Sequence, residues 1–105
     1  MLDTTLVIVS SEFGRTPEIN HMAGRDHWPS CFSVVLAGAG ITGGRVWGSS
    51  DEKGMFVKDN PVQVPDFIAS IYQKLGINYQ KEYMSNIGRP VKLTDDGKPL
   101  EFLMV

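Results

Sequence analysis

The chain has 105 residues, of which 42% are apolar and 21% charged, a balance that suits one small globular domain with a modest core. A formal net charge of -2 and the lack of any basic run argue against nucleic acid or an anionic membrane surface as a partner. Cys31 is the only cysteine, which excludes a disulfide within the chain. The first apolar run, residues 6–9, is too short to insert across a bilayer and is not preceded by the basic region of a signal peptide.

Two strands are predicted in the first half of the chain. Residues 4–10 contain the continuous run Leu-Val-Ile-Val, which is typical of a strand covered on both faces in a parallel sheet. Residues 31–37, Cys-Phe-Ser-Val-Val-Leu-Ala, form the second candidate. We therefore expect an α/β fold, in which ligands bind beyond the carboxyl ends of the strands. The residues directly after position 10 would lie at such an end.

The segment between these strands, residues 11–30, is predicted to be a polar loop. It contains both histidines and Trp28, together with three carboxylates, and it has no convincing period. A long polar loop between two buried strands is costly to order and usually has a function. We expect it to form the chemical rim of the sheet.

The glycines at 38, 40, 43 and 44 do not favour nucleotide binding. Their spacing differs from Gly-x-Gly-x-x-Gly, and no Lys-Ser/Thr pair of the P-loop type follows them. A short edge strand over 45–48 and a polar turn region over 49–60 are predicted next.

One clear helix is predicted over residues 65–75. Pro65 suits the first helical position, the apolar residues recur at helical spacing, and Gly76 supplies the stop. Residues 78–86 are expected to be irregular and residues 88–93 to form a strand. The turn signal Asp-Asp-Gly at 95–97 then predicts a terminal hairpin with residues 100–105.

Glu12 and the pair Asp26-His27 are candidate metal ligands at the two ends of the loop. Carboxylate and imidazole donors together suit zinc, manganese or iron, and carboxylates with water suit magnesium or calcium. Adjacent residues in an extended segment point in opposite directions. One of Asp26 and His27 would therefore bind the ion, and the other would orient it or contact the substrate.

Plainer interpretations of the same residues stay open. Glu12 can be a solvated carboxylate and His27 a histidine that only forms hydrogen bonds. Arg15 and Arg25 can clamp a phosphate or sulfate, or can pair with nearby carboxylates. A serine hydrolase is not favoured, because no Gly-x-Ser-x-Gly elbow occurs. Cys31 is interpreted as buried filler rather than a nucleophile.

Several blocks resemble one known family. They are Glu-Phe-Gly-Arg-Thr-Pro at 12–17, Gly-Arg-Asp-His-Trp-Pro at 24–29, Val-Leu-Ala-Gly-Ala-Gly-Ile at 35–41, Ile-Ala-Ser-Ile-Tyr-Gln-Lys-Leu-Gly-Ile at 68–77 and Gly-Arg-Pro-Val at 88–91. In this order, and over nearly the whole chain, they resemble the domain of unknown function 1501. That family looks like a branch of the alkaline phosphatase and sulfatase superfamily.

The resemblance implies a fold and a function. Family members are several times longer, and this segment is similar to their C-terminal end. Residues 1–105 would be a single domain, the C-terminal part of an alkaline phosphatase/sulfatase-like sheet with a covering helix and a terminal β-hairpin. The full-length relatives would be metal-dependent hydrolases of phosphate or sulfate esters, exported or periplasmic. The nucleophile and first metal ligands would lie outside this chain, so we expect it to be inactive alone and to self-associate through apolar surface that the missing part would cover.

The resemblance also implies site residues. Glu12 and Phe13 stand where the superfamily has a metal-binding Asp-His pair, and His27 stands where a later histidine binds metal. Glu12, His27 and Asp26 would be ligands of zinc, manganese or calcium. Arg15 and Arg25 would face a small anionic ester or glycan. Phe13 cannot bind a metal, and this departure favours the alternative of a non-catalytic module that binds a partner or an anionic glycan.

Overall fold

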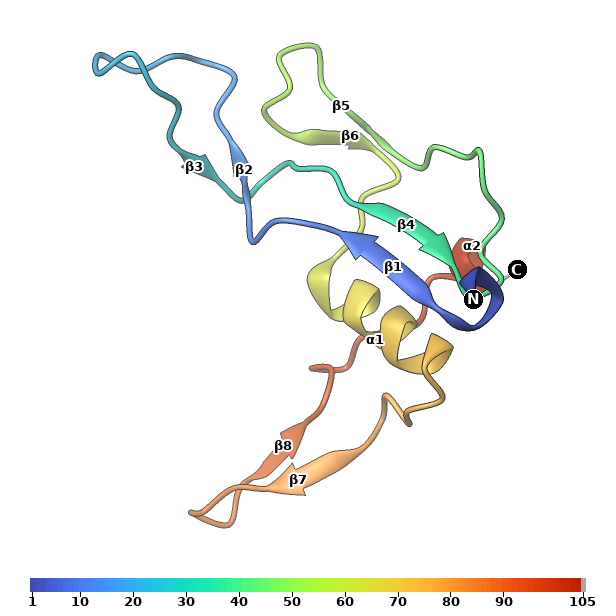
Figure 1. Ribbon diagram of the computed structural model, residues 1–105. Coiled ribbons are helices and arrows are strands. Elements are labelled where there is room, and N and C mark those ends of the chain that lie inside the picture. The colour runs from blue at the N-terminus through green and yellow to red at the C-terminus, as the bar shows by residue number, and fades with distance from the viewer. Residues whose placement is uncertain (105) are drawn as a thin grey trace. The chain divides into compact units, whose positions relative to one another are not determined.

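The computed structural model describes residues 1–104. The chain divides into two compact units, Met1–Pro61 and Val62–Val105. Both contain short antiparallel strand pairs, and the second contains the longer helix, so the chain is broadly α/β (Figure 1). No helix in the described part of the chain has the length and apolar character that a membrane span requires. The prediction of one domain over 1–105 stays a prediction.

The first unit begins with a short 3-10 helix, η1 (Leu2–Thr4), and the strand pair β1 (Leu6–Val9) and β4 (Val35–Gly38). β1 lies within the predicted strand, whereas β4 begins at Val35 rather than at Cys31. The pair is antiparallel, with Leu6 opposite Gly38 and Val9 opposite Val35. The predicted parallel arrangement is therefore wrong for these two strands. The antiparallel register places the end of β1 beside the start of β4, so the intervening segment leaves and returns at one end of the pair (Figure 1).

The predicted burial of these strands on both faces is also wrong. The exposed fractions are 44% for Val7, 37% for Ile8, 62% for Val9 and 61% for Val35. An antiparallel pair accepts such exposure because its backbone ladder does not need a helix layer on each face, as a parallel sheet does. Among the described residues, no third strand joins this pair. Four of its apolar side chains are thus left without the cover that their composition predicts, and Leu6, Leu36 and Ala37 are half-buried.

The predicted loop between β1 and β4 contains a ladder of its own, formed by β2 (Gly14–Arg15) and β3 (His27–Trp28). We call residues 12–29 the motif arm. A tight turn closes it: the Asn20 side-chain Oδ1 accepts hydrogen bonds from the backbone N–H groups of Met22 (2.9 Å) and Gly24 (3.0 Å). Such side-chain to backbone bonds let Asn replace a backbone turn partner. The polar composition predicted a loop because a two-residue strand is too short to show a period.

A second hairpin follows in the first unit, formed by β5 (Ser49–Ser50) and β6 (Val57–Asp59). It lies within the predicted polar turn region, and the predicted edge strand over 45–48 does not form. Gly48 has φ +83°, and a Cβ there would lie 3.1 Å from the Asp59 carbonyl oxygen. The chain therefore turns at Gly48, and pairing begins at Ser49, directly after the predicted strand would have ended.

The second unit contains the helix α1 (Val64–Lys74), which confirms the predicted helix to within one residue at each end. Pro65 lies in its first turn, and Gly76 ends it with φ +78°. Ala69 of α1 is fully buried, and Leu103 of the short helix α2 (Glu101–Met104) is 6% exposed. These two side chains form the buried apolar core of the described residues.

The predicted terminal hairpin is wrong. The strand expected over 88–93 forms as β8 (Pro90–Lys92), but its partner is β7 (Glu82–Met84), in the segment expected to be irregular. Residues 101–104 form α2 instead of a strand. The reason is that side chains of α1 bind the backbone that follows the turn. The N–H of Lys98 donates to the Asp66 carboxylate (2.9 Å), and the N–H of Leu100 donates to the Ser70 hydroxyl (2.7 Å). These two N–H groups therefore cannot donate to a neighbouring strand.

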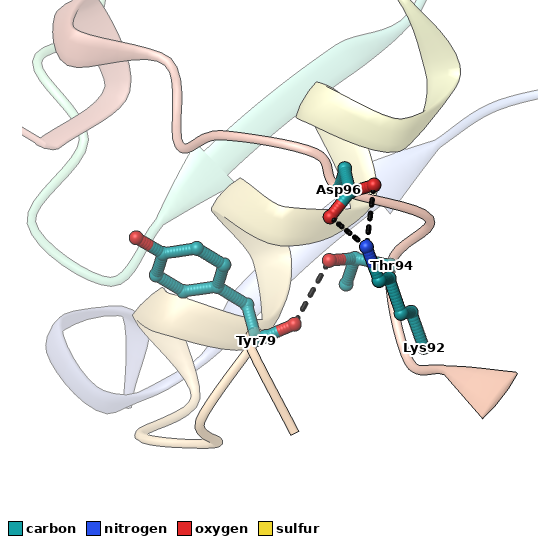
Figure 2. Close-up of polar contacts among 4 residues, drawn as sticks. All are labelled: Tyr79, Lys92, Thr94 and Asp96. Carbon is teal, nitrogen blue, oxygen red and sulfur yellow. Dashed lines mark hydrogen bonds and ion pairs between the residues drawn. The ribbon is translucent and has the colours of Figure 1, made fainter. Parts of the chain in front are cut away.

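Polar contacts hold the turn that follows β8 (Figure 2). The buried Thr94 donates its hydroxyl hydrogen to the Tyr79 carbonyl oxygen at 2.8 Å, and the Lys92 ammonium contacts both Asp96 carboxylate oxygens at 2.6 and 2.7 Å. Hydrogen bonding to Asp96 and its negative charge raise the pKa of Lys92 above the usual 10.5. The turn signal in the sequence is thus a real turn, with Asp95 and Asp96 both at positive φ.

Candidate functional site

The two halves of the motif arm pair with each other. In the ladder Gly14 lies opposite Trp28, and Arg15 lies opposite His27. The pairing extends one residue further, because the N–H of Thr16 donates to the Asp26 carbonyl (3.0 Å) and the N–H of Asp26 donates to the Thr16 hydroxyl (3.1 Å). The sequence blocks 12–17 and 24–29 therefore form one structural element. The pairing of the two blocks as strands was not predicted, although the shared metal site assigned to Glu12 and His27 requires them to lie near each other.

Phe13 and His27 stack, with ring centroids 4.1 Å apart and an interplanar angle of 28°. Phe13 is half-buried and His27 is exposed. Stacking uses the face of the imidazole, while the nitrogen lone pair lies in the ring plane. The ring nitrogen atoms of His27 therefore stay available to a ligand while Phe13 restricts the orientation of the ring. Phe13 thus has a structural use at the position where it cannot bind metal.

Glu12 lies beside this stack in an open depression of the surface. The depression is lined by Ser10, Ser11, Glu12, Phe13 and Arg15. It combines one carboxylate, one guanidinium, two hydroxyl groups and an aromatic ring. The Ser11 hydroxyl donates to the Phe13 carbonyl at 2.8 Å, which fixes the chain where β1 passes into the arm. These groups can bind a small polar ligand, by ionic contact at one side and by an apolar contact at the other.

Both arginines use one nitrogen to close the arm. Nη1 of Arg25 donates to the carbonyl oxygens of Thr16, at 3.0 Å, and Pro17, and Nη1 of Arg15 donates to the Arg25 carbonyl at 3.2 Å. The alternative in which they pair with nearby carboxylates is not supported, since the ion pair found in residues 1–104 is that of Lys92 with Asp96. Each exposed guanidinium keeps further N–H donors for an anion. Their assignment to an anionic ligand stays a prediction.

Asp26 contributes to the turn of the arm. Its Oδ1 accepts a hydrogen bond from the side-chain amide of Asn20 at 2.9 Å. Asn20 is the same residue that closes the turn through Met22 and Gly24. Asp26 therefore orders the segment that leads into His27, whether or not its other oxygen binds a ligand.

The predicted metal ligands do not gather into one cluster. Within residues 1–104, no group of three or more His, Cys, Asp or Glu side chains is arranged to hold a metal ion. Glu12, Asp26 and His27 therefore do not make a complete three-ligand site in this chain. They can supply at most part of one, and each individual assignment stays a prediction.

Trp28 is a residue of the arm to which the sequence assigned no role. Its indole N–H donates to the Met55 carbonyl at 2.5 Å, and its ring meets Phe56 edge-on with centroids 5.6 Å apart. These contacts join the arm to the β5–β6 hairpin, which lies beside it in Figure 1. The only signal in the sequence was its position next to His27 in a recognisable block.

Comparison with known proteins identifies the family. A family model described as "Protein of unknown function (DUF1501)" matches residues 1–104. No curated protein and no solved structure matches the chain. Because the match spans all the described residues, including the arm and α1, this chain belongs to the DUF1501 family.

Proposed function

We propose that this chain is the C-terminal part of a sulfatase-like, metal-dependent hydrolase of phosphate or sulfate esters, related to the alkaline phosphatase superfamily. The supporting observation is the motif arm, in which pairing of β2 with β3 brings the block that carries Glu12 against the block that carries His27. Two separate loops would not hold Glu12 and His27 near each other. A single element that carries an imidazole and a guanidinium on its short strands, and a carboxylate just before them, is suited to an anionic substrate.

In this proposal Glu12 and His27 each supply one metal ligand, and Arg15 contacts the anionic group from the same depression as Glu12. A bound divalent ion would stabilise negative charge on the transferring group. The remaining ligands would come from outside the chain, because residues 1–104 contain no complete ligand cluster. The superfamily resemblance implies that the nucleophile would lie outside it as well. The chain alone is then inactive as a hydrolase.

The test is metal binding by the longest natural polypeptide that contains this chain, measured calorimetrically with Zn²⁺ and Mn²⁺. Glu12→Ala and His27→Ala each remove one proposed ligand and should weaken binding about tenfold or more, because even residues that only support ligands cost about 10- to 100-fold when mutated. His21→Ala and Glu18→Ala are matched controls, since both lie in the arm but outside the proposed ligand pair. Neither control should change the affinity.

Hydrolysis of 4-nitrophenyl phosphate and 4-nitrophenyl sulfate by the same proteins provides the second readout. The expected result is activity that depends on added metal and is lost in His27→Ala. Wild-type protein that binds neither ion, or variants at Glu12 and His27 that bind as tightly as wild type, would exclude the hydrolase proposal.

A non-catalytic module that binds an anionic glycan is the second candidate. The stack of Phe13 on His27 favours it, because an aromatic side chain stands at a position that a two-metal site would give to a ligand. Binding of a sulfated oligosaccharide without metal, weakened by Arg15→Gln, would support this candidate. An unsulfated oligosaccharide of the same length is the control, and equal binding of both would exclude it.

A further inference from the structure

We propose that Trp28 is a positioning residue, which holds the His27 imidazole on the Phe13 ring by anchoring β3 to the β5–β6 hairpin. The role of His27 toward a metal rests on the proposed function above. The positioning itself does not, because it concerns the orientation of one side chain in the protein without ligand.

The ladder of the arm is too short to fix His27 alone. β2 and β3 have two residues each, and an isolated two-stranded hairpin is marginally stable at best in water. The other hydrogen bonds across the arm, from Arg15, Arg25 and Asp26, end on oxygen atoms of residues 16, 17 and 25 and not on the His27 ring. His27 itself is exposed and has one ring contact, with Phe13. A second tie is therefore needed if the imidazole is to keep one orientation.

Trp28 supplies that tie from the next position in the chain. Its side chain is half-buried, and its indole N–H reaches the carbonyl of Met55, 27 residues further along. The edge-to-face contact between the Trp28 ring and Phe56 adds a second point of attachment to the same hairpin. In an extended segment, neighbouring side chains point to opposite faces. Anchoring Trp28 on one face therefore directs His27 to the other, where Phe13 lies.

A further contact supports the same junction. A Cβ at Gly54 would lie 3.6 Å from Cγ of Pro17, an ordinary van der Waals distance, so the arm and the hairpin also approach each other there. The tip of the β5–β6 hairpin is itself ordered, because the N–H of Met55 donates to the Asp51 carboxylate at 2.9 Å. The acceptor carbonyl of Met55 is thus held in place when Trp28 reaches it.

The test uses Trp28→Phe, which keeps an aromatic ring against Phe56 but removes the indole donor. The first readout is NMR of the His27 ring protons, which are shifted by the Phe13 ring in the stack. In Trp28→Phe we expect this shift to fall toward the values of His21, the internal reference. The second readout is Zn²⁺ and Mn²⁺ binding by the longest natural polypeptide, where we expect about a tenfold loss, as for residues that orient a ligand. Trp47→Phe makes the same change at the other tryptophan and should leave both readouts unchanged.

Phe56→Leu is the second variant, because it removes the edge contact without altering Trp28, and it keeps the test decisive if Trp28→Phe fails to fold. A smaller loss of the His27 ring shift is expected for it. Unchanged ring shifts in every folded variant of this pair would overturn the positioning role, whatever the metal affinity. A third outcome separates the two proposals. If the wild-type protein binds no metal but the Trp28→Phe variant loses the stack of Phe13 on His27, the proposed function is contradicted and the positioning role is supported.

Discussion

The two units of this chain differ in what holds them together. Among residues 1–104, all the buried residues lie in the second unit: Ala69, Ser70, Thr94, Gly97 and Leu103. The first unit carries all the candidate site residues, and no described residue in it is fully buried. Four apolar side chains of β1 and β4 are exposed, and the other three are only half-buried. The site therefore lies on a unit ordered mainly by hydrogen bonds and turns, and the buried core lies where no candidate site residue is found.

This difference predicts that the first unit would gain more stability than the second from a layer that covers its apolar strands. Burial of apolar surface is the main favourable term in folding, and the first unit leaves its most apolar strands in solvent. In the second unit, buried polar groups are satisfied by specific partners, and no described buried side-chain nitrogen or oxygen atom is left without one. The following substitutions test the contrast, beginning with the largest expected effect.

Gly97→Ala should cause the largest loss of stability, about 3 kcal/mol, because overpacking costs of this size arise when the neighbouring atoms cannot move. A Cβ at Gly97 would lie 2.0 Å from the Pro65 carbonyl oxygen and 2.3 Å from its carbonyl carbon. Gly43→Ala in the first unit is the control, since a Cβ there meets nothing within 4 Å. Urea unfolding followed by circular dichroism measures both. Equal stability of the two variants would contradict the close packing of the second unit.

Ser70→Ala should destabilise the second unit by about 1–3 kcal/mol, the cost of leaving a buried polar group unsatisfied. The Ser70 hydroxyl donates to the Asp66 carbonyl (2.8 Å) and accepts from the N–H of Leu100 (2.7 Å), so its removal frees the segment that leads into α2. Ser33→Ala, at an exposed position of the first unit, should change the unfolding free energy by less than about 0.5 kcal/mol. Faster amide exchange at Leu100 in Ser70→Ala alone is the specific signature, and its absence would refute the role of this hydroxyl.

The double substitution Val9→Thr and Val35→Thr should reduce hydrophobic dye binding and self-association with little change in strand structure. The two residues lie opposite each other in the β1–β4 pair, and threonine keeps the β-branched shape while removing an apolar group. Val91→Thr in β8 is the matched control in the second unit. Dye fluorescence and analytical ultracentrifugation at micromolar concentration provide the readouts. A wild-type monomer that binds no dye would show that this surface needs no cover.

Removal of the Lys92–Asp96 ion pair should have the smallest effect on the free energy of unfolding, because the two side chains are 47% and 74% exposed. Because Asp96 raises the folded-state pKa of Lys92 above 10.5, the stabilising contribution is complete below that value and is lost as the pH rises through the raised pKa. The urea midpoint of wild type should therefore fall slightly more than that of Asp96→Asn between pH 9 and 12. Asparagine also tolerates the positive φ of 63° at this position. Identical pH profiles would show that the pair does not contribute.

Several features could be predicted from the sequence because they depend on neighbouring residues. The helix α1 forms where Pro65 and Gly76 mark its ends, since proline suits the first turn and glycine adopts positive φ at the stop. The turn at Asp95 and Asp96 and the strand run of β1 are local in the same sense. The sequence blocks were also sufficient to identify the family.

Tertiary structure alone decided how these elements pair. The runs that form β1 and β4 contain no signal for direction, and their antiparallel pairing depends on the path of the motif arm between them. The C-terminal segment became a helix because Asp66 and Ser70 took its backbone donors. The stack of Phe13 on His27 joins residues 14 positions apart, and the Trp28 contact spans 27. Local propensity determines single elements, whereas these contacts arise from hydrogen bonds and packing between segments that are distant in the sequence.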